Sequence, residues 1–159
     1  MLDPNGNRQA GKQDHLPRGS ALLKSATRIV HLFFLVFSLF FLLAAPFAGP
    51  VDQLIPGFLK ILTSPQILTT DACALGGLNG ALLNAGLLGL LSWALMKFSG
   101  DPATGASFSA FFLTLGYAFF GQNCLNVLPL ILGTWLFSKI KRQPFRNYVN
   151  MSLFACSLA

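Results

Sequence analysis

Five side-chain amides are the residues whose type and spacing could do chemistry in this chain. Asn79 and Asn84 lie in a glycine-rich apolar segment, and Gln122, Asn123 and Asn126 lie between two apolar arms. An amide both donates and accepts hydrogen bonds without carrying a charge. The two groups therefore predict a binding site for a neutral or zwitterionic solute, or for an ion held by carbonyl oxygens, rather than a proton relay.

The second amide group interrupts a stretch without charged residues that runs from Ala106 to Ser138. At about 1.5 Å per residue, one helix over this stretch would exceed the roughly 30 Å hydrocarbon core of a bilayer, whereas each arm alone is a little short. Gly121 and Pro129 flank the amides and allow the backbone to leave helical geometry. The sequence predicts either a helical hairpin that turns at Gln122–Asn126 or a deep re-entrant loop. A hydrated and inert surface loop is the alternative to a binding site.

The first amide group shares its segment with Gly76 and Gly80. Small residues at this spacing let two helix backbones approach closely within a membrane. Asn79 and Asn84 are roughly 140° apart around an ideal helix, so they do not share one narrow stripe. We therefore expect a helix-packing face at the two glycines. We also expect Asn79, or Asn84, to line a shared polar site with Asn123 and Asn126, with Asn79 in direct or water-bridged hydrogen-bonding reach of the second amide group.

The composition indicates the environment in which such elements fold. Hydrophobic residues make up 53% of the chain and charged residues 10%, and the mean hydropathy is +0.61. A soluble domain carries about 25% charged residues, so the composition predicts a membrane protein. The formal net charge is +6, but the basic residues flank apolar segments. The charge therefore indicates orientation in a lipid bilayer, and we expect no binding to nucleic acid.

The apolar segments predict an all-α fold, a polytopic helical membrane protein with about four transmembrane helices plus a partial fifth and one interfacial or re-entrant helix. Asp71 is expected to cap the second full span. A signal peptide is the alternative for the first span, but the long basic leader and the later spans favour a retained anchor. The expected segments are a disordered basic tail at 1–28 and a membrane domain at 29–159, with spans at about 29–48, 72–97, 106–121 and 126–140, an interfacial helix at about 52–64 and an incomplete span at 147–159, where the chain looks truncated.

The basic residues also predict a topology. All of them except Lys60 fall on one side if the N-terminus is cytoplasmic. Residues 139–146 then face the cytoplasm and residues 52–70 face outward, as the positive-inside rule requires. We expect a multi-pass protein of the inner cell membrane.

Signatures of catalysis and of metal binding are missing from the sequence. It contains no paired carboxylates, no P-loop and no serine with a positioned histidine base. Asp71 and Asp101 are isolated, and they are explained as a helix cap and a turn residue. The three cysteines, Cys73, Cys124 and Cys156, are widely spaced and predicted to pack as small residues. We expect no enzymatic activity, no metal and no cofactor.

Three segments carry a family resemblance, TDACALGGLNGALLNAGLLGLL (70–91), AFFGQN (118–123) and LPLILGTWLFSKIKRQPF (128–145). They resemble a family of uncharacterised bacterial and archaeal multi-pass membrane proteins that carry a domain of unknown function. The resemblance covers most of residues 29–159, and it implies that this chain corresponds to the N-terminal portion of longer members. It implies no activity and no functional residues.

The sequence favours a transporter or channel component that handles a small solute. The alternative is a non-transport membrane scaffold or assembly protein whose glycine faces hold a complex together, and a homo-oligomer fits either function. A second copy of the GGLNG and FGQN patterns further along the chain would favour transport, because related breaks in two halves mark a transport pathway.

Overall fold

The computed structural model consists of helices and the turns that connect them, as the sequence predicts. It describes residues 16–64 and 70–157, with side chains from residue 22 onward, and no strand occurs in these ranges. The helices in chain order are α1 (Leu16–Ala44), η1 (Ala45–Phe47), α2 (Val51–Thr63), α3 (Ala72–Ser99), α4 (Gly105–Tyr117), α5 (Cys124–Ile140), η2 (Phe145–Asn147) and α6 (Val149–Cys156).

Two helices are much longer than the others. α1 has 29 residues and α3 has 28, and at 1.5 Å per residue each is a little over about 40 Å long. By length and composition, Leu22–Phe47 and Ala72–Ser99 are apolar enough to cross a membrane, and α5 is a shorter apolar helix. α4 has 13 residues, so it is about 20 Å long and shorter than a full span.

α1 and α3 pack closely because glycines of α3 face α1 where the two helices meet. A Cβ added at Gly86 would lie 2.7 Å from Cγ of Leu42, and one at Gly89 would lie 3.1 Å from Cβ of Ser38. Further along α1, the buried ring of Phe34 stacks on the ring of Phe111 from α4, with 4.2 Å between the centroids. These contacts join α1, α3 and α4 into the main apolar core.

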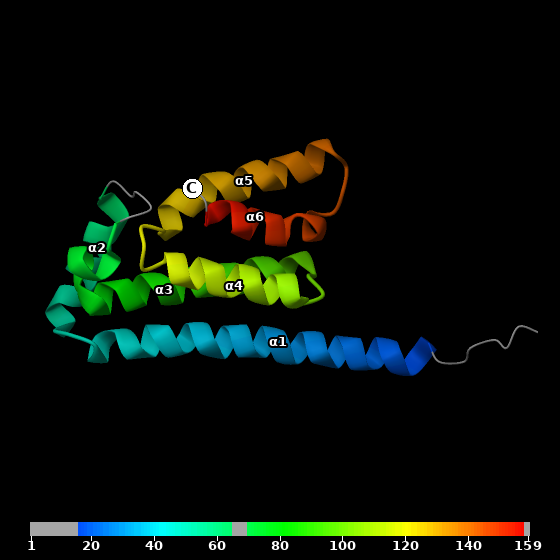
Figure 1. The fold of residues 1–159 in the computed structure, drawn as a ribbon, viewed down its shortest axis with the longest axis horizontal. Coiled ribbons are helices and arrows are strands. Elements are labelled where there is room, and N and C mark those ends of the chain that lie inside the picture. Colours follow the sequence, from blue (N-terminus) through cyan, green and yellow to red (C-terminus); the bar gives the residue numbers. More distant parts are fainter. Residues whose placement is uncertain (1–15, 65–69, 158–159) are drawn as a thin grey trace, which may run out of the picture.

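α2 lies across the first turns of α3, at the left end of the molecule in Figure 1. Gly76 and Gly80 form this contact together with Gly57 of α2. A Cβ at Gly80 would lie 2.9 Å from the backbone carbonyl carbon of Gly57, and one at Gly76 would lie 2.7 Å from Cδ1 of Ile61. The two backbones approach so closely that side chains larger than hydrogen have no room there.

The predicted span at 72–97 is not one straight helix. Asp71 caps its first turn, as predicted, because its side chain accepts from the backbone N–H groups of Cys73 and Ala74. Gly77 then adopts φ 75° and ψ 164°, a conformation that is available almost only to glycine. This kink differs from the predicted continuous span, and the double glycine Gly76-Gly77 is the sequence signal for it.

The charge-free stretch forms two antiparallel helices, α4 and α5, joined by a turn at residues 118–123 (Figure 1). This arrangement is the hairpin alternative, but the two arms are not tightly paired. α6 lies between them and packs against both, whereas α4 and α5 make few direct contacts. The first arm ends at Tyr117, four residues before the predicted end at 121, because the chain turns at Ala118.

One predicted boundary is wrong and another shifts slightly. The predicted disordered tail at 1–28 is helical from Leu16 onward, because alanine, leucine, lysine and arginine at 21–28 favour a helix and Pro17 lies in the first turn, where proline is tolerated. The predicted incomplete span at 147–159 is preceded by the 3-10 turn η2, and its α-helix covers Val149–Cys156. Residues 1–15 and 158–159 lie outside the described residues.

Candidate functional site

Most of the turn between α4 and α5 is buried against neighbouring helices, although the side chain of Phe120 is exposed. Gly121, Gln122 and Asn123 are all buried, and Gly121 has φ 90°. The backbone carbonyl of Phe119 accepts a hydrogen bond from the backbone N–H of Ala72 at 3.0 Å. The turn is therefore part of the interior, in contrast to the hydrated surface loop that the sequence left open.

Asn84 connects α3 to this turn. Its side chain is fully buried, and its Nδ2 donates to the carbonyl of Ala118 at 2.9 Å and to that of Gln122 at 2.7 Å. Both carbonyls lie beyond the last helical residue of α4, where backbone groups have no partner within the helix. The Asn84 amide supplies the donors that they need.

The kink at Gly77 explains how two distant parts of α3 reach the same turn. Ala72 and Asn84 would be about 18 Å apart along the axis of a straight helix. Nevertheless, Ala72 contacts Phe119 and Asn84 contacts its neighbour Ala118. Gly77 lies between the two positions and redirects the first turn of α3 toward the turn at 118–123.

Asn123 and Asn126 form a reciprocal cap at the start of α5. Oδ1 of Asn123 accepts from the N–H groups of Leu125 and Asn126, and Oδ1 of Asn126 accepts from the N–H of Asn123 at 2.8 Å. Their amide groups donate to the carbonyls of Ile61 and Gly121. The hydrogen-bonding capacity of both residues is thus largely committed to holding the helix end in place.

Asn79 hydrogen-bonds to the chain before α2 and not to the turn at 118–123. Its Nδ2 donates to the carbonyl of Pro50 at 2.9 Å, and its Oδ1 accepts from the N–H of Gly80. A Cβ at Gly49 would lie 3.3 Å from Cγ of Asn79, so the chain entering α2 covers this face of α3. The expected hydrogen bond from Asn79 to the second amide group is therefore wrong. Asn84 contacts that group instead, through the backbone carbonyl of Gln122.

Gln122 is the predicted residue whose side chain keeps its hydrogen-bonding capacity. Only 5% of Gln122 is exposed, and neither Nε2 nor Oε1 has a hydrogen-bond partner in the structure. Oδ1 of Asn84 is also buried without a partner. Burying an amide without hydrogen-bond partners costs about 1 to 3 kcal/mol. A small polar molecule that bound here would recover this cost, because Nε2 of Gln122 can donate to it and the two side-chain oxygens can accept from it.

A second polar cluster lies at the opposite end of the bundle, around Asp101. The Asp101 side chain is 3% exposed and accepts from Oγ of Ser107 at 2.5 Å, from Nδ2 of Asn150 at 3.1 Å and from the N–H of Ala103 at 3.1 Å. Nε2 of His31 lies 3.2 Å from the Asp101 backbone carbonyl. The cluster joins α1, α4 and α6 around the turn that follows α3.

From the sequence, Asp101 is predicted to be a turn residue. Its neighbours Asn150 and His31 could not be predicted, because they are far from Asp101 in the chain. Ser107 bonds to Asp101 and not to His31, so the geometry here does not pair a serine nucleophile with a histidine base. Within residues 16–64 and 70–157, no group of three histidine, cysteine or acidic side chains could hold a metal. The three cysteines are free thiols spread over α3, α5 and α6.

A family model matches residues 51–159, from the start of α2 onward. The first predicted span at 29–48 lies outside the match, so the match is shorter than the resemblance noted in the sequence. No curated protein and no solved structure matches the chain. The match covers more than half of the sequence, and the chain therefore belongs to a family described as protein of unknown function (DUF1576).

Proposed function

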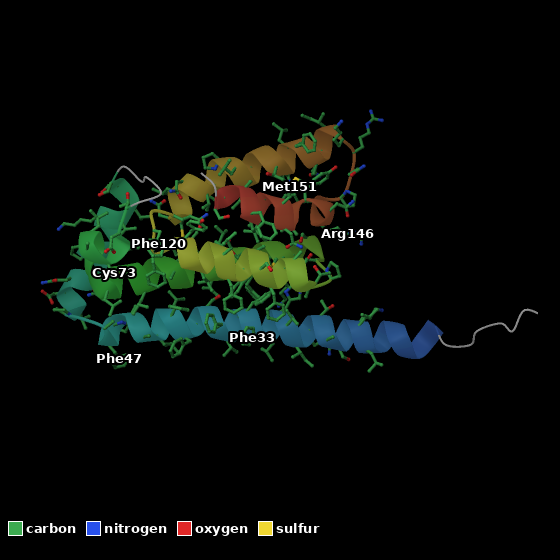
Figure 2. The ribbon with its side chains drawn as sticks, in the orientation of Figure 1. Phe33, Phe47, Cys73, Phe120, Arg146 and Met151 are labelled. Atoms are coloured by element: carbon green, nitrogen blue, oxygen red, sulfur yellow. The ribbon has the colours of Figure 1, made fainter. Side chains whose placement is uncertain are left out.

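We propose that this chain is a multi-pass protein of the inner cell membrane with a cytoplasmic N-terminus. The long apolar helices support this location, as do the exposed leucines of α5, Leu132 and Leu136, which would form an unfavourable apolar surface in water. The start of α1, the end of α3 and the turn after α5 lie at one end, where Figure 2 places Arg146, whereas Cys73 and Phe120 lie at the other. Among the residues that the structure describes, the basic ones other than Lys60 thus lie toward the proposed cytoplasmic end.

Labelling of single cysteines tests this topology in a variant in which the three native cysteines are replaced by alanine. Gln53 on α2 and Gln143 after α5 are both exposed. A membrane-impermeant maleimide added to intact cells is expected to label Gln53→Cys and not Gln143→Cys. The reverse pattern would overturn the topology. Labelling of neither site in intact cells but of both in lysed cells would overturn the membrane-spanning arrangement.

Within the membrane, the chain is a component of a transporter or channel for a small solute. The observation that carries this function is the buried Gln122 amide without hydrogen-bond partners at the break between α4 and α5. There the Asn84 amide donates to the Gln122 backbone carbonyl, while Oδ1 of Asn84 has no partner. α4 begins on the cytoplasmic side in the proposed topology and is about 20 Å long, so the break lies within the roughly 30 Å hydrocarbon core. Water is scarce at that depth, and a passing solute is the partner that the amide lacks.

Two helix interruptions meet at this place. One is the kink at Gly77 and the other is the turn at 118–123, and interrupted helices with irregular backbone characterise transporter binding sites. The site carries amides and no charged side chain, which favours a neutral or zwitterionic solute. The scaffold alternative is weaker because Gly76 and Gly80 pack on α2 of the same chain and do not present a free face to another subunit.

Solute uptake into vesicles tests the function. The full chain is reconstituted into phosphatidylcholine vesicles, and the rate of light-scattering change is measured after mixing with urea, glycerol or glycine. The native chain is expected to accelerate the entry of at least one of these solutes over empty vesicles. Gln122→Met is expected to return that rate to the level of empty vesicles, whereas the matched variant Gln53→Met, on the exposed face of α2, leaves it unchanged.

Thermal unfolding of the same variants separates a lost site from a lost fold. Replacing a buried amide without partners by an apolar side chain of similar shape is neutral or stabilising. Gln122→Met should therefore unfold at the same temperature as the native chain or higher, even though flux falls. Full flux in Gln122→Met would refute the site, and no acceleration by the native chain would favour the scaffold function instead.

A further inference from the structure

A groove runs between α1 and α3 at the end of the bundle opposite to Gln122. It has a volume of about 730 Å³. Its walls are mainly apolar, and the turn after α3 closes one side of it. The apolar side chains that line it are Leu23, Leu32, Leu35 and Trp93.

Three cations lie along the same groove. Lys24 and Arg28 come from α1 and are exposed, and Lys97 comes from the last turn of α3. Nζ of Lys97 lies 4.7 Å from the centroid of the Trp93 ring, which fixes one positive charge over the apolar wall. The groove therefore combines an apolar floor with a positively charged rim.

The remaining polar groups of the groove do not cancel this charge at the rim. Asp101 is the one carboxylate among the lining residues, and its oxygens accept hydrogen bonds from Ser107, Asn150 and the backbone of Ala103. His31 contacts the backbone carbonyl of Asp101. An anionic ligand thus meets three side-chain cations, while the single carboxylate is occupied by neutral donors.

We propose that this groove binds one anionic phospholipid, with its phosphate at Lys24 and Arg28 and an acyl chain along Leu32, Leu35 and Trp93. Inorganic phosphate would use the rim but would leave the apolar walls uncovered, and an uncharged lipid would leave the cations without a partner. A ligand with both parts fits the whole surface, and anionic lipids of the cytoplasmic leaflet attract basic residues at this level. The inference rests on the proposed membrane location, but not on solute transport.

The two tryptophans of the chain provide matched reporters. Trp93 lines the groove, whereas Trp135 lies on α5 outside it, and each has a lysine above its ring, Lys97 or Lys139. Trp135→Phe leaves Trp93 as the only tryptophan, and Trp93→Phe leaves Trp135. Each variant is reconstituted into phosphatidylcholine vesicles that contain a minor fraction of either phosphatidylglycerol or phosphatidylcholine with brominated acyl chains, and quenching of fluorescence is compared.

Trp93 is expected to be quenched more by brominated phosphatidylglycerol than by brominated phosphatidylcholine, and Trp135 about equally by both. In the Trp93 reporter, the apparent affinity for phosphatidylglycerol should fall about fivefold for each cation removed in Lys24→Gln/Arg28→Gln. Lys139→Gln/Lys141→Gln removes the same charge outside the groove and should leave the preference unchanged. Thermal unfolding is measured for both double variants, and it should match that of the native chain. If the Lys24→Gln/Arg28→Gln protein is unfolded, the single variant Lys24→Gln is used in its place.

An equal headgroup preference at the two tryptophans would overturn the proposal, and so would an equal loss in the two charge pairs, because general surface charge would explain either result. Quenching of both tryptophans without any headgroup preference would refute the groove and leave the membrane location standing. If neither lipid quenched either tryptophan, the membrane location itself would be wrong. The uptake assay with Gln122→Met is independent of all these outcomes.

Discussion

At the α2 end of the bundle the buried polar groups are neutral amides that bind backbone carbonyls, whereas at the opposite end they surround a carboxylate beside an open, basic groove. The first end is closed by direct contact of glycine backbones, and it leaves the amide of Gln122 inside without partners. At the second end, the Asp101 side chain accepts hydrogen bonds from neutral donors, Nδ1 of His31 and Oδ1 of Asn150 are buried without partners, and the cations of the groove are exposed. The contrast teaches that the two ends bury different chemistry, neutral amides at the α2 end and a carboxylate with its donors beside exposed cations at the other.

The largest expected effect tests the glycine contact at the α2 end. Gly76→Leu should lower the free energy of unfolding by about 3 kcal/mol, because the new side chain must enter the space occupied by Gly57 and Ile61. Gly133→Leu on α5 is the matched control, since a Cβ there has no atom within 4 Å. Denaturant unfolding in detergent measures both. A Gly76→Leu protein as stable as the control would show that the α2 end is loosely packed. The α2 end would then not differ from the opposite end in how tightly it is closed.

The next effect concerns the amide that ties α3 to the break. Asn84→Leu should cost about 2 kcal/mol, because the carbonyls of Ala118 and Gln122 lose a buried donor. Hydrogen exchange of the amides in residues 118–126 should accelerate in the same variant. Unchanged stability together with unchanged exchange would mean that other groups hold the turn.

A smaller loss is expected at the basic end. Asp101→Asn retains the size of the side chain but turns one acceptor into a donor, which then faces the donors of Asn150 or Ala103. The expected cost is about 1.5 kcal/mol, in the range for hydrogen bonds to charged groups. Thermal unfolding compares it with Asp52→Asn, an exposed position in the first turn of α2. If Asp101→Asn lost more stability than Asn84→Leu, the polar contacts at the basic end would stabilise the fold more than those at the α2 end, which is the reverse of the expected order.

The elements of the fold follow from local signals in the sequence. The prolines around 52–64 mark a short helix, Asp71 marks the start of α3, and the amides after Gly121 mark the end of an arm. Each of these signals involves only residues that are close together in the chain, so it can be recognised from the sequence alone. The backward extension of α1 to Leu16 escaped because helix propensity there outweighs the glycine and proline content that indicated a tail.

The partners of the site residues could not be predicted in the same way. The sequence identifies Asn79 and Asn84 as equally suitable amides, and the choice between them depends on the position of Pro50 and on the direction of the kink at Gly77. Both are results of tertiary packing. The Asp101 cluster escaped for the same reason, because Ser107, Asn150 and His31 are separated in the chain and carry no shared motif.

The position of α6 has a consequence for the order in which the molecule assembles during synthesis. α4 and α5 leave the ribosome before α6, yet they make few contacts with each other, and Val149, Leu153 and Cys156 of α6 fill the space between them. A nascent chain that has not yet released α6 therefore leaves apolar faces of α4 and α5 uncovered. The packing of α4 and α5 on α6 therefore forms only after α6 is released, and until then those faces are open to chaperones and to other nascent chains.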